Sequence, residues 1–232
     1  MNVTKIPYPP AAANLNIFMG VDDDTKTRPD EVRVLCALAA QTRGNLLEIG
    51  TNRGRTTRAL AKQSAPRLVY AVDFIPPVCE SAMAREQVNE IPTMETVCLH
   101  ARNLPNVHLS LLDSKTFDYA GKNIGFVFID GNHTLEGVRA DTELALAAMR
   151  DGQTAFPFII AWHDYYDDRP VDSCFVRVRQ YLDETFSEHW PVKHVTGTAV
   201  AYAEWPAAGG DEGGKAGAEW EWVLGPSSRV VA

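Results

Sequence analysis

Short apolar segments alternate with longer amphipathic segments along most of the chain, and this alternation predicts strands alternating with helices. The predicted strands span residues 46–49, 67–73, 107–113, 123–130, 156–162, 192–195 and 198–204. The predicted helices span residues 29–41, 55–64, 78–89, 94–103, 135–149 and 171–186. Helices placed between strands in this way favour an α/β fold with a doubly wound, mostly parallel sheet.

The predicted strand at residues 123–130 is apolar along nearly its whole length, as a central parallel strand covered on both faces requires. Residues 192–195 and 198–204 are separated only by a short turn at Gly197. Such a short connection joins antiparallel strands. We therefore expect a seven-stranded sheet in which this C-terminal antiparallel hairpin forms one edge.

We expect a single domain over residues 1–206, because a chain of 232 residues is long enough to bury one large core. Residues 207–217 have too little apolar surface to pack and predict a flexible glycine-rich link. The tail at residues 218–232 carries Trp220 and Trp222, which favours docking on the body of the protein or on a second subunit. A homo-oligomer is compatible with the sequence but is not specified by it.

Composition and charge disfavour several classes of function. The net charge of −8 argues against a nucleic-acid partner, because such binding depends on Lys and Arg that neutralise phosphates. No segment approaches the ~18 apolar residues of a membrane span, and the N-terminus lacks the order of a signal peptide, so we expect a cytoplasmic protein. The four cysteines form no C-x-x-C pair and indicate core thiols. A small or neutral substrate is the favoured partner.

The segment Leu46–Gly54 (LLEIGTNRG) is an apolar strand that carries a carboxylate and then turns through two glycines into a predicted helix. Gly50 and Gly54 would let the backbone approach a ligand without an intervening Cβ. The next strand ends in Asp73, which is placed to accept hydrogen bonds from two ribose hydroxyls. Loop and acid together predict a nucleoside cofactor. The alternative is an ordinary strand–helix turn that happens to be glycine-rich.

The spacing of the glycines narrows the choice of cofactor. The G-x-G-x-x-G fingerprint of NAD and FAD sites is missing, because Asn52 and Arg55 occupy its second and third glycine positions. A phosphate-binding G-x-x-x-x-G-K-[ST] loop is also absent from the sequence. The remaining pattern, E-x-G-x-x-x-G with an acid on the next strand, resembles motif I and the acidic loop of class I S-adenosylmethionine-dependent methyltransferases. The resemblance implies a Rossmann-like fold and S-adenosylmethionine as cofactor.

A second group of polar residues follows the fourth and fifth predicted strands. Asp130 ends the fourth strand, and His163 and Asp164 end the fifth. Ligands of open α/β sheets bind outside the carboxyl ends of the strands, so we expect these side chains to meet there. Two carboxylates and an imidazole can hold a hard divalent cation such as magnesium. In the alternative interpretation, the aspartates cap helices, and His133 and His163 are core histidines bonded to backbone groups.

The chain is similar to a group of methyltransferases that includes the macrocin and mycinamicin sugar O-methyltransferases and cephalosporin-hydroxylase-like proteins. The similarity lies in four segments within about residues 45–166: LLEIGTNRG, YAVD, FIDGNHTLEGVRADTELALAAMRDG and AWHDY. It implies that Asp130 and Asp164 are metal ligands and that His133 is the catalytic base. The chain departs from the group at His163, where relatives often carry an acid, and at Asp151-Gly152-Gln153, which replaces a glycine pair.

These features favour metal-assisted transfer of the sulfonium methyl of S-adenosylmethionine to a hydroxyl of a small molecule, sugar or natural product. Glu48 and Gly50 would position the methionine end of the cofactor, Asp73 its ribose, and Asp113 with Ser114 its adenine. The other candidate cofactor contacts are Thr51, Asn52, Gly54 and Asp130.

The acceptor pocket is expected to form from the N-terminal segment and residues 76–92 and 165–173, which carry no readable specificity code. Three other functions remain open. They are a methyltransferase-like protein that binds a nucleoside without turnover, a metal-independent N-methyltransferase and a nucleotide-dependent oxidoreductase with an unusual loop.

Overall fold

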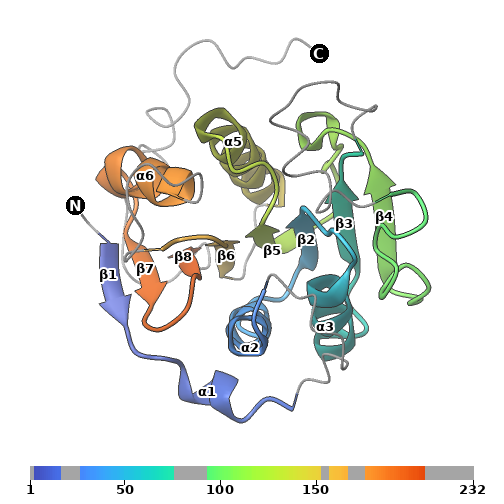
Figure 1. Ribbon diagram of the computed structural model, residues 1–232, viewed down its shortest axis with the longest axis horizontal. Helices are drawn as coiled ribbons and strands as arrows, with labels where there is room; N and C mark the ends of the chain where they lie inside the picture. The colour runs from blue at the N-terminus through green and yellow to red at the C-terminus, as the bar shows by residue number, and fades with distance from the viewer. Residues whose placement is uncertain (1–2, 17–26, 76–92, 153–156, 167–175, 207–232) are drawn as a thin grey trace.

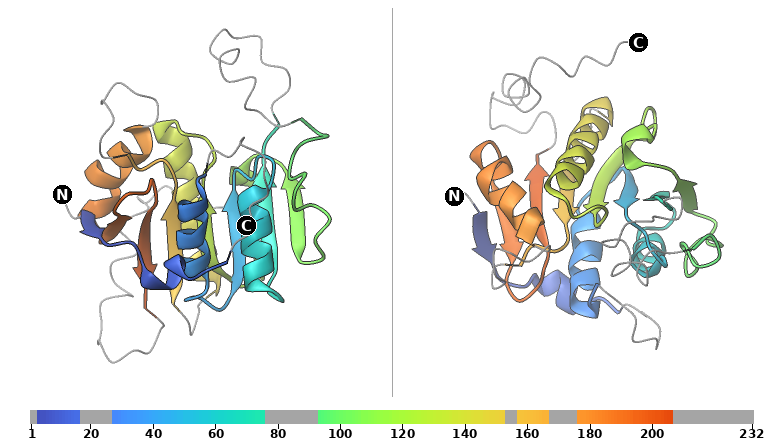
Figure 2. Two further views of the ribbon diagram at one scale, coloured as in Figure 1. Left: turned by 60° about the horizontal axis from the view of Figure 1, so that its bottom comes forward. Right: turned by 45° about the horizontal axis from the view of Figure 1, so that its top comes forward.

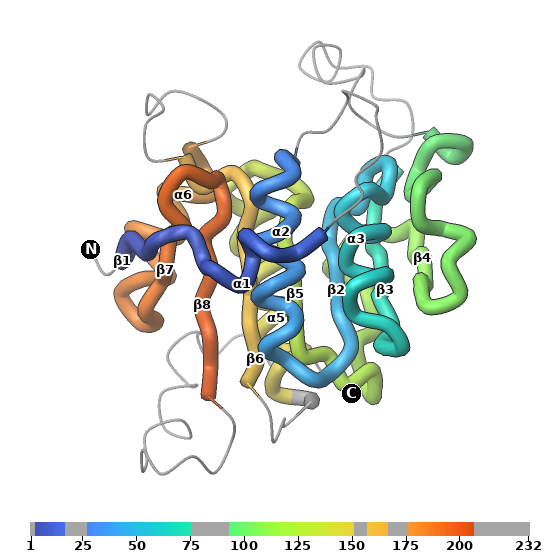
Figure 3. The backbone as a smooth tube through the Cα atoms, turned by 90° about the horizontal axis from the view of Figure 1, so that it is seen from below, coloured from blue at the N-terminus to red at the C-terminus, as the bar shows by residue number. Residues whose placement is uncertain are grey.

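The computed structural model describes residues 3–16, 27–75, 93–152, 157–166 and 176–206. Its central element is a single eight-stranded sheet between two layers of helices (Figure 1). Read across the sheet, as in Figure 3, the strands are β1 (Val3–Ile6), β7 (Val192–Val195), β8 (Ala201–Trp205), β6 (Phe158–Trp162), β5 (Ile124–Ile129), β2 (Asn45–Ile49), β3 (Val69–Asp73) and β4 (Val107–Leu111). The pairings are parallel except for the two that β8 makes, with β6 and β7.

Each face of the sheet is covered by a pair of helices, as the two views of Figure 2 show. One pair is α2 (Pro29–Ala39) and α3 (Arg55–Ser64), and the other is α5 (Leu135–Gly152) and α6 (Val176–Glu184). The shorter elements are α1 (Pro10–Ala13) and the 3₁₀ turns η1 (Ser114–Thr116) and η2 (Phe186–Glu188). In the ranges that the structure describes, every helix is too short or too polar to cross a membrane.

The central strand β5 divides its side chains between the two helical layers. Phe126 and Phe128 pack against the α2 and α3 side, and Val127 and Ile129 pack against the α5 and α6 side. All six residues of the strand are buried. Successive side chains of a strand point to opposite faces, so a strand covered twice must be apolar throughout. The expectation of a central strand here is confirmed.

The ends of the central strands lie level with one another, and this positions the site. The Gly50 amide donates to the Val72 carbonyl over 2.8 Å, and the Asp130 amide donates to the Ile49 carbonyl over 2.9 Å. The His163 amide continues the ladder by donating to the Ile129 carbonyl over 3.0 Å. The first residues after β2, β5 and β6 are therefore side by side.

The predicted α/β fold with a mostly parallel sheet and a C-terminal hairpin is confirmed, with two corrections. The sheet has eight strands rather than seven, because the N-terminal residues Val3–Ile6 pair in parallel with β7. The hairpin is therefore not the edge of the sheet, since β1 lies outside it. A four-residue strand that contains a threonine and a lysine gives no readable apolar pattern, and its pairing with β7 supplies the missing stabilisation.

The helix expected at residues 94–103 is wrong, since the segment forms successive turns. Cys98 has a left-handed backbone (φ 51°) that interrupts helical geometry. Its amide donates to the Asn52 carbonyl over 2.7 Å, and the His100 amide donates to the Arg53 carbonyl over 3.0 Å. The segment follows the loop after β2 instead of forming its own helix. The helix expected at 78–89, the link at 207–217 and the tail at 218–232 lie outside the described residues.

Candidate functional site

The loop after β2 is hydrogen-bonded to the acid that ends β3. The Asn52 amide donates to Asp73 Oδ2 over 2.6 Å, and the Phe74 amide donates to Asp73 Oδ1 over 2.8 Å. Burial raises the pKa of the Asp73 carboxyl, although these two N–H donors oppose the shift. Each oxygen retains a further lone pair. The structure thus places Asp73 and the loop side by side, as the sequence predicts for a ribose site.

Glu48 lies in the interior on the side of the sheet that α3 covers. Its side chain is buried, and the Thr57 hydroxyl at the start of α3 donates to its Oε2. The Thr51 and Thr57 hydroxyls are in turn hydrogen-bonded to each other. Burial raises the pKa of Glu48 to about 8, with a smaller contribution from the charges of Asp130 and Asp73. Glu48 therefore joins the end of β2 to α3 as a largely protonated carboxyl at neutral pH.

The two glycines of the loop are required by contacts within the protein. Gly50 has φ 87°, and a Cβ there would lie 2.1 Å from the Asp130 carbonyl oxygen. Gly54 has φ 79°, and a Cβ there would lie 2.9 Å from Cys98 Cα. Real Cβ atoms do not approach this closely, so any other residue at either position would force the neighbouring backbone to move. The sequence predicts that these glycines let a ligand approach, and the structure gives a packing reason for each.

The residues expected at the adenine already have partners in the protein. Asp113 accepts from the Lys115 amide over 3.0 Å and so caps η1. The Ser114 hydroxyl donates to Asp141 Oδ1 of α5 over 2.5 Å. Burial raises the pKa of Asp141 to about 6, although the Ser114 hydrogen bond opposes the shift. Sequence reasoning missed Asp141, which fastens η1 to α5.

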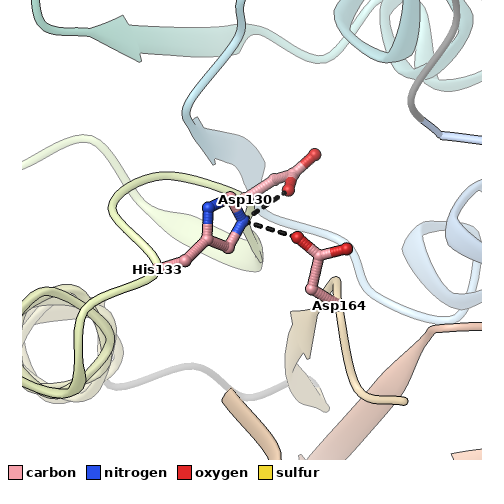
Figure 4. Close-up of side chains that lie close together, drawn as sticks. All are labelled: Asp130, His133 and Asp164. Carbon is pink, nitrogen blue, oxygen red and sulfur yellow. Dashed lines mark ion pairs between the residues drawn. The ribbon is translucent and has the colours of Figure 1, made fainter. Parts of the chain in front are cut away.

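Asp130, His133 and Asp164 form a cluster at the ends of β5 and β6 (Figure 4). His133 Nε2 lies 2.6 Å from Asp164 Oδ2 and 3.5 Å from Asp130 Oδ1. One ligand atom from each side chain lies within 4.8 Å of the others, so the three could hold a metal ion. The His133 side chain is 37% exposed, and those of Asp130 and Asp164 are 18% and 8% exposed. The His133 side chain is thus the most exposed of the three, although its Nε2 atom, which faces the aspartates, is buried.

His163 lies behind the two aspartates and is almost completely buried. Its Nδ1 is 3.3 Å from Asp130 Oδ1 and 3.2 Å from Asp164 Oδ1. Its Nε2 is 3.2 Å from Glu31 Oε2 on α2. The structure therefore brings together the predicted set Asp130, His163 and Asp164. It is His133, however, that completes the group able to hold a metal in the described part of the chain.

Mutual contacts shift the pKa values of the cluster strongly. Burial alone would lower the pKa of His133, but its contacts with Asp130 and Asp164 raise that pKa to about 10. Burial would also lower the pKa of His163, but the neighbouring carboxylates raise it well above its ordinary value. Burial would raise the pKa of Asp130 and of Asp164, but the two histidines hold both below the ordinary range. The positive charges of the two histidines and the negative charges of the two aspartates therefore stabilise one another.

Sequence reasoning missed Glu31, although a signal for it was present. Glu31 shares one stripe of α2 with Leu35 and Leu38, at the spacing i, i+4, i+7 that marks the buried face of a helix. All three are buried, and the side chain of Glu31 is only 2% exposed. A carboxylate on an apolar stripe requires a buried partner. That partner is His163.

The comparisons with known proteins agree with this architecture. Residues 47–165, just over half of the chain, match a family model described as a methyltransferase domain. The chain belongs to this methyltransferase family. The resemblance to class I methyltransferases is thereby confirmed. No curated protein matches the sequence.

Two solved structures share the fold. Cofactor-bound Rv0187 from MTB is 22% identical, with 80% of this chain and 83% of that chain covered and a TM-score of 0.52. The SAH-bound Podospora anserina methyltransferase PaMTH1 is 11% identical, with 78% and 80% covered and a TM-score of 0.52. At these sequence identities, the similarity shows that the fold is shared and nothing more.

The packing of Gly50 against β5 predicts a specific cost of substitution. Gly197 has a similar backbone (φ 83°) but nothing within 4 Å of a Cβ, so it is the matched control. Gly197→Ala should lower the free energy of unfolding by about 1–2 kcal/mol through left-handed strain alone. Gly50→Ala adds a collision and should cost about 2–5 kcal/mol. Urea unfolding of both variants measures the difference, and equal losses would refute the packing role.

The buried Glu48 predicts how stability changes with pH. Its pKa is about 8 in the folded protein against an ordinary value of 4.5, so the folded state binds the extra proton between these pH values. The stability that Glu48 contributes is complete below pH 4.5 and is lost as pH rises toward 8. Glu48→Gln should therefore become more stable relative to wild type as pH rises, by at most about 1.4 kcal/mol per pH unit. Urea unfolding at pH 5, 6.5 and 8 in chelator tests this, and a constant difference would contradict it.

Proposed function

We propose that the protein is an S-adenosylmethionine-dependent O-methyltransferase that acts on a hydroxyl of a small molecule with the help of a divalent cation. The observation that carries the proposal is the Asp130–His133–Asp164 cluster, which lies at the same sheet edge as Asp73 and the loop after β2. Membership of the methyltransferase family supplies the reaction class. The cluster supplies the argument for a hydroxyl acceptor, since an alcohol must lose its proton to become a good nucleophile.

The geometry around Asp73 supports the methyl donor. Its two oxygens are oriented by backbone donors, and each keeps a lone pair for a ribose hydroxyl. Asn52, whose amide is one of those donors, has a left-handed backbone (φ 48°). Non-glycine residues in this conformation concentrate at functional loops. Two structures of the same fold are described as cofactor-bound and SAH-bound, which agrees with this assignment.

The donor set of the cluster fits a hard divalent cation. Asp130 and Asp164 would hold it, since carboxylate oxygens are the preferred ligands of magnesium and manganese. When bound, such a cation supplies Lewis acidity toward a substrate hydroxyl. Asp164 has a left-handed backbone (φ 58°), and its two oxygens lie 2.6 Å from His133 Nε2 and 3.2 Å from His163 Nδ1.

The His133 imidazole is the proposed acceptor of the hydroxyl proton. Its side chain is the most exposed of the three, and the contact of its buried Nε2 with Asp164 Oδ2 orients the ring. The two aspartates raise the pKa of His133 to about 10, so the imidazole is protonated at neutral pH when no cation neutralises the aspartates. We therefore propose that His133 acts as a base only when the cation is bound. Alignment of donor and acceptor supplies the rest of the catalysis, worth up to about 7–11 kcal/mol in favourable systems.

A second role for His133 is favoured by one observation, its place in the group that could hold a metal. As a third ligand it would contribute to cation affinity. As a base it would contribute to turnover and leave cation affinity nearly unchanged. The variants below separate the two roles.

Removal of the Asp73 carboxylate should weaken the binding of S-adenosylhomocysteine. We expect Asp73→Ala to lose about 1.5–3 kcal/mol, as for hydrogen bonds to a charged group. Asp118 is the matched control, because its side chain also accepts a backbone amide, that of Ala120, over 3.0 Å. Calorimetric titration should show unchanged affinity in Asp118→Ala and no binding of NADH to any form. Wild-type affinity in a folded Asp73→Ala variant would remove the ribose role.

Chelation should abolish methyl transfer, and magnesium or manganese should restore it. The assay follows labelled methyl from S-adenosylmethionine into a panel of hydroxylated sugars and phenols. Asp130→Asn and Asp164→Asn should lose the response to metal, because each removes an anionic ligand. His133→Ala should keep its affinity for S-adenosylhomocysteine and manganese while kcat falls about 10²- to 10⁴-fold. His108→Ala, at an exposed position of β4, is the control histidine.

The outcomes of this assay separate the alternatives. Full activity in chelator would remove the cation from the mechanism, and transfer only to amines would favour an N-methyltransferase. Cofactor binding without transfer to any acceptor would favour a protein that binds nucleoside without turnover. Loss of manganese affinity in His133→Ala would make that histidine a ligand, and full activity would return it to a structural role.

A further inference from the structure

Glu31 is a buried carboxylate that connects α2 to the acid cluster. Its Oε1 accepts from the Ala199 amide over 2.8 Å and lies 3.1 Å from the Arg28 guanidinium. Its Oε2 accepts from the Arg28 amide over 2.8 Å and lies 3.2 Å from His163 Nε2. Contacts at both oxygens leave the carboxylate little freedom. A buried charge is costly unless it is held this way, so its position is well defined.

His163 connects Glu31 to the two aspartates. Ionised carboxylates only accept hydrogen bonds, so each ring nitrogen of His163 must donate to the acid that it faces. Nε2 faces Glu31, and Nδ1 faces Oδ1 of both Asp130 and Asp164. With Nε2 held by Glu31, the ring is oriented so that Nδ1 reaches both aspartates. The second oxygen of Asp164, Oδ2, faces His133, and Asp130 Oδ1 lies between the two histidines.

We propose that Glu31 is a positioning residue for the acid cluster, acting through His163 to fix the two aspartates in the arrangement that binds the divalent cation. The inference rests on the proposed function, because it takes Asp130 and Asp164 as the cation's ligands. Outer residues that orient metal ligands typically contribute 10- to 100-fold to metal affinity. Glu31 differs from a purely structural buried acid in that its effect must pass through His163.

Binding of manganese alone tests the proposal, without any need for a methyl acceptor. Electron paramagnetic resonance of free Mn²⁺ gives the dissociation constants of wild type, Glu31→Gln, His163→Gln and the double variant. We expect Glu31→Gln to bind Mn²⁺ about 10- to 100-fold more weakly. The double variant should bind no more weakly than His163→Gln alone, because residues that act in series are not additive. Asp30→Asn, a neighbouring exposed acid that pairs with Arg28, should bind as wild type does.

Rescue and stability separate positioning from general damage. Glu31→Asp keeps the charge and should recover part of the affinity that Glu31→Gln loses, at an equal or lower melting temperature. If Glu31→Gln does not fold, Glu31→Asp and its double variant with His163→Gln take its place, with the same non-additivity expected.

Wild-type affinity in Glu31→Gln, or additive losses in the double variant, would overturn the role of Glu31 and leave the proposed function intact. Absence of Mn²⁺ binding in wild type would overturn both the positioning role and the metal half of the proposed function.

Discussion

The contact between the loop after β2 and the end of β5 is the constraint on which the site depends. The Asp130 amide bonds to the Ile49 carbonyl, and the Asp130 carbonyl occupies the place that a side chain on Gly50 would need. The loop after β2 and the first aspartate of the cluster are therefore one packed unit. A change in either displaces the other, which explains why the glycine is required independently of any ligand.

Electrostatics imposes a second constraint on the same edge. Glu31, Asp130 and Asp164 would repel one another if left alone, and His133 and His163 compensate them. His163 is enclosed between three carboxylates, whereas His133 reaches the accessible side. The inner histidine therefore compensates the acids from the interior, and the outer one contacts the two aspartates of the cluster from its more exposed side.

Much of this architecture follows from local sequence signals. Helix 55–64 and the strands of the central sheet were predicted because apolar periodicity and glycine turns mark them clearly. Asp130, His163 and Asp164 were expected together because parallel strands end at one edge. β1 and the turns around Cys98 were not predictable, because both depend on pairing with residues far away in the chain, Val192–Val195 for β1 and Asn52 with Arg53 for the turns. Such contacts override local preference.

The alternation of side chains along β6 distinguishes the two histidines. Trp162 packs toward α5 and α6, and side chains of a strand alternate, so the next residue, His163, points toward α2. Phe128, on the α2 side of β5, contacts the His163 ring edge-on with the centroids 6.3 Å apart, as this parity requires. Counting from the apolar residues therefore assigns His163 to the interior and leaves His133, on the turn before α5, as the histidine available for chemistry. The same parity directs His163 at the helix that carries the buried Glu31. The alternation of side chains along β6 thus predicts the contact between His163 and α2, which the residue types alone do not.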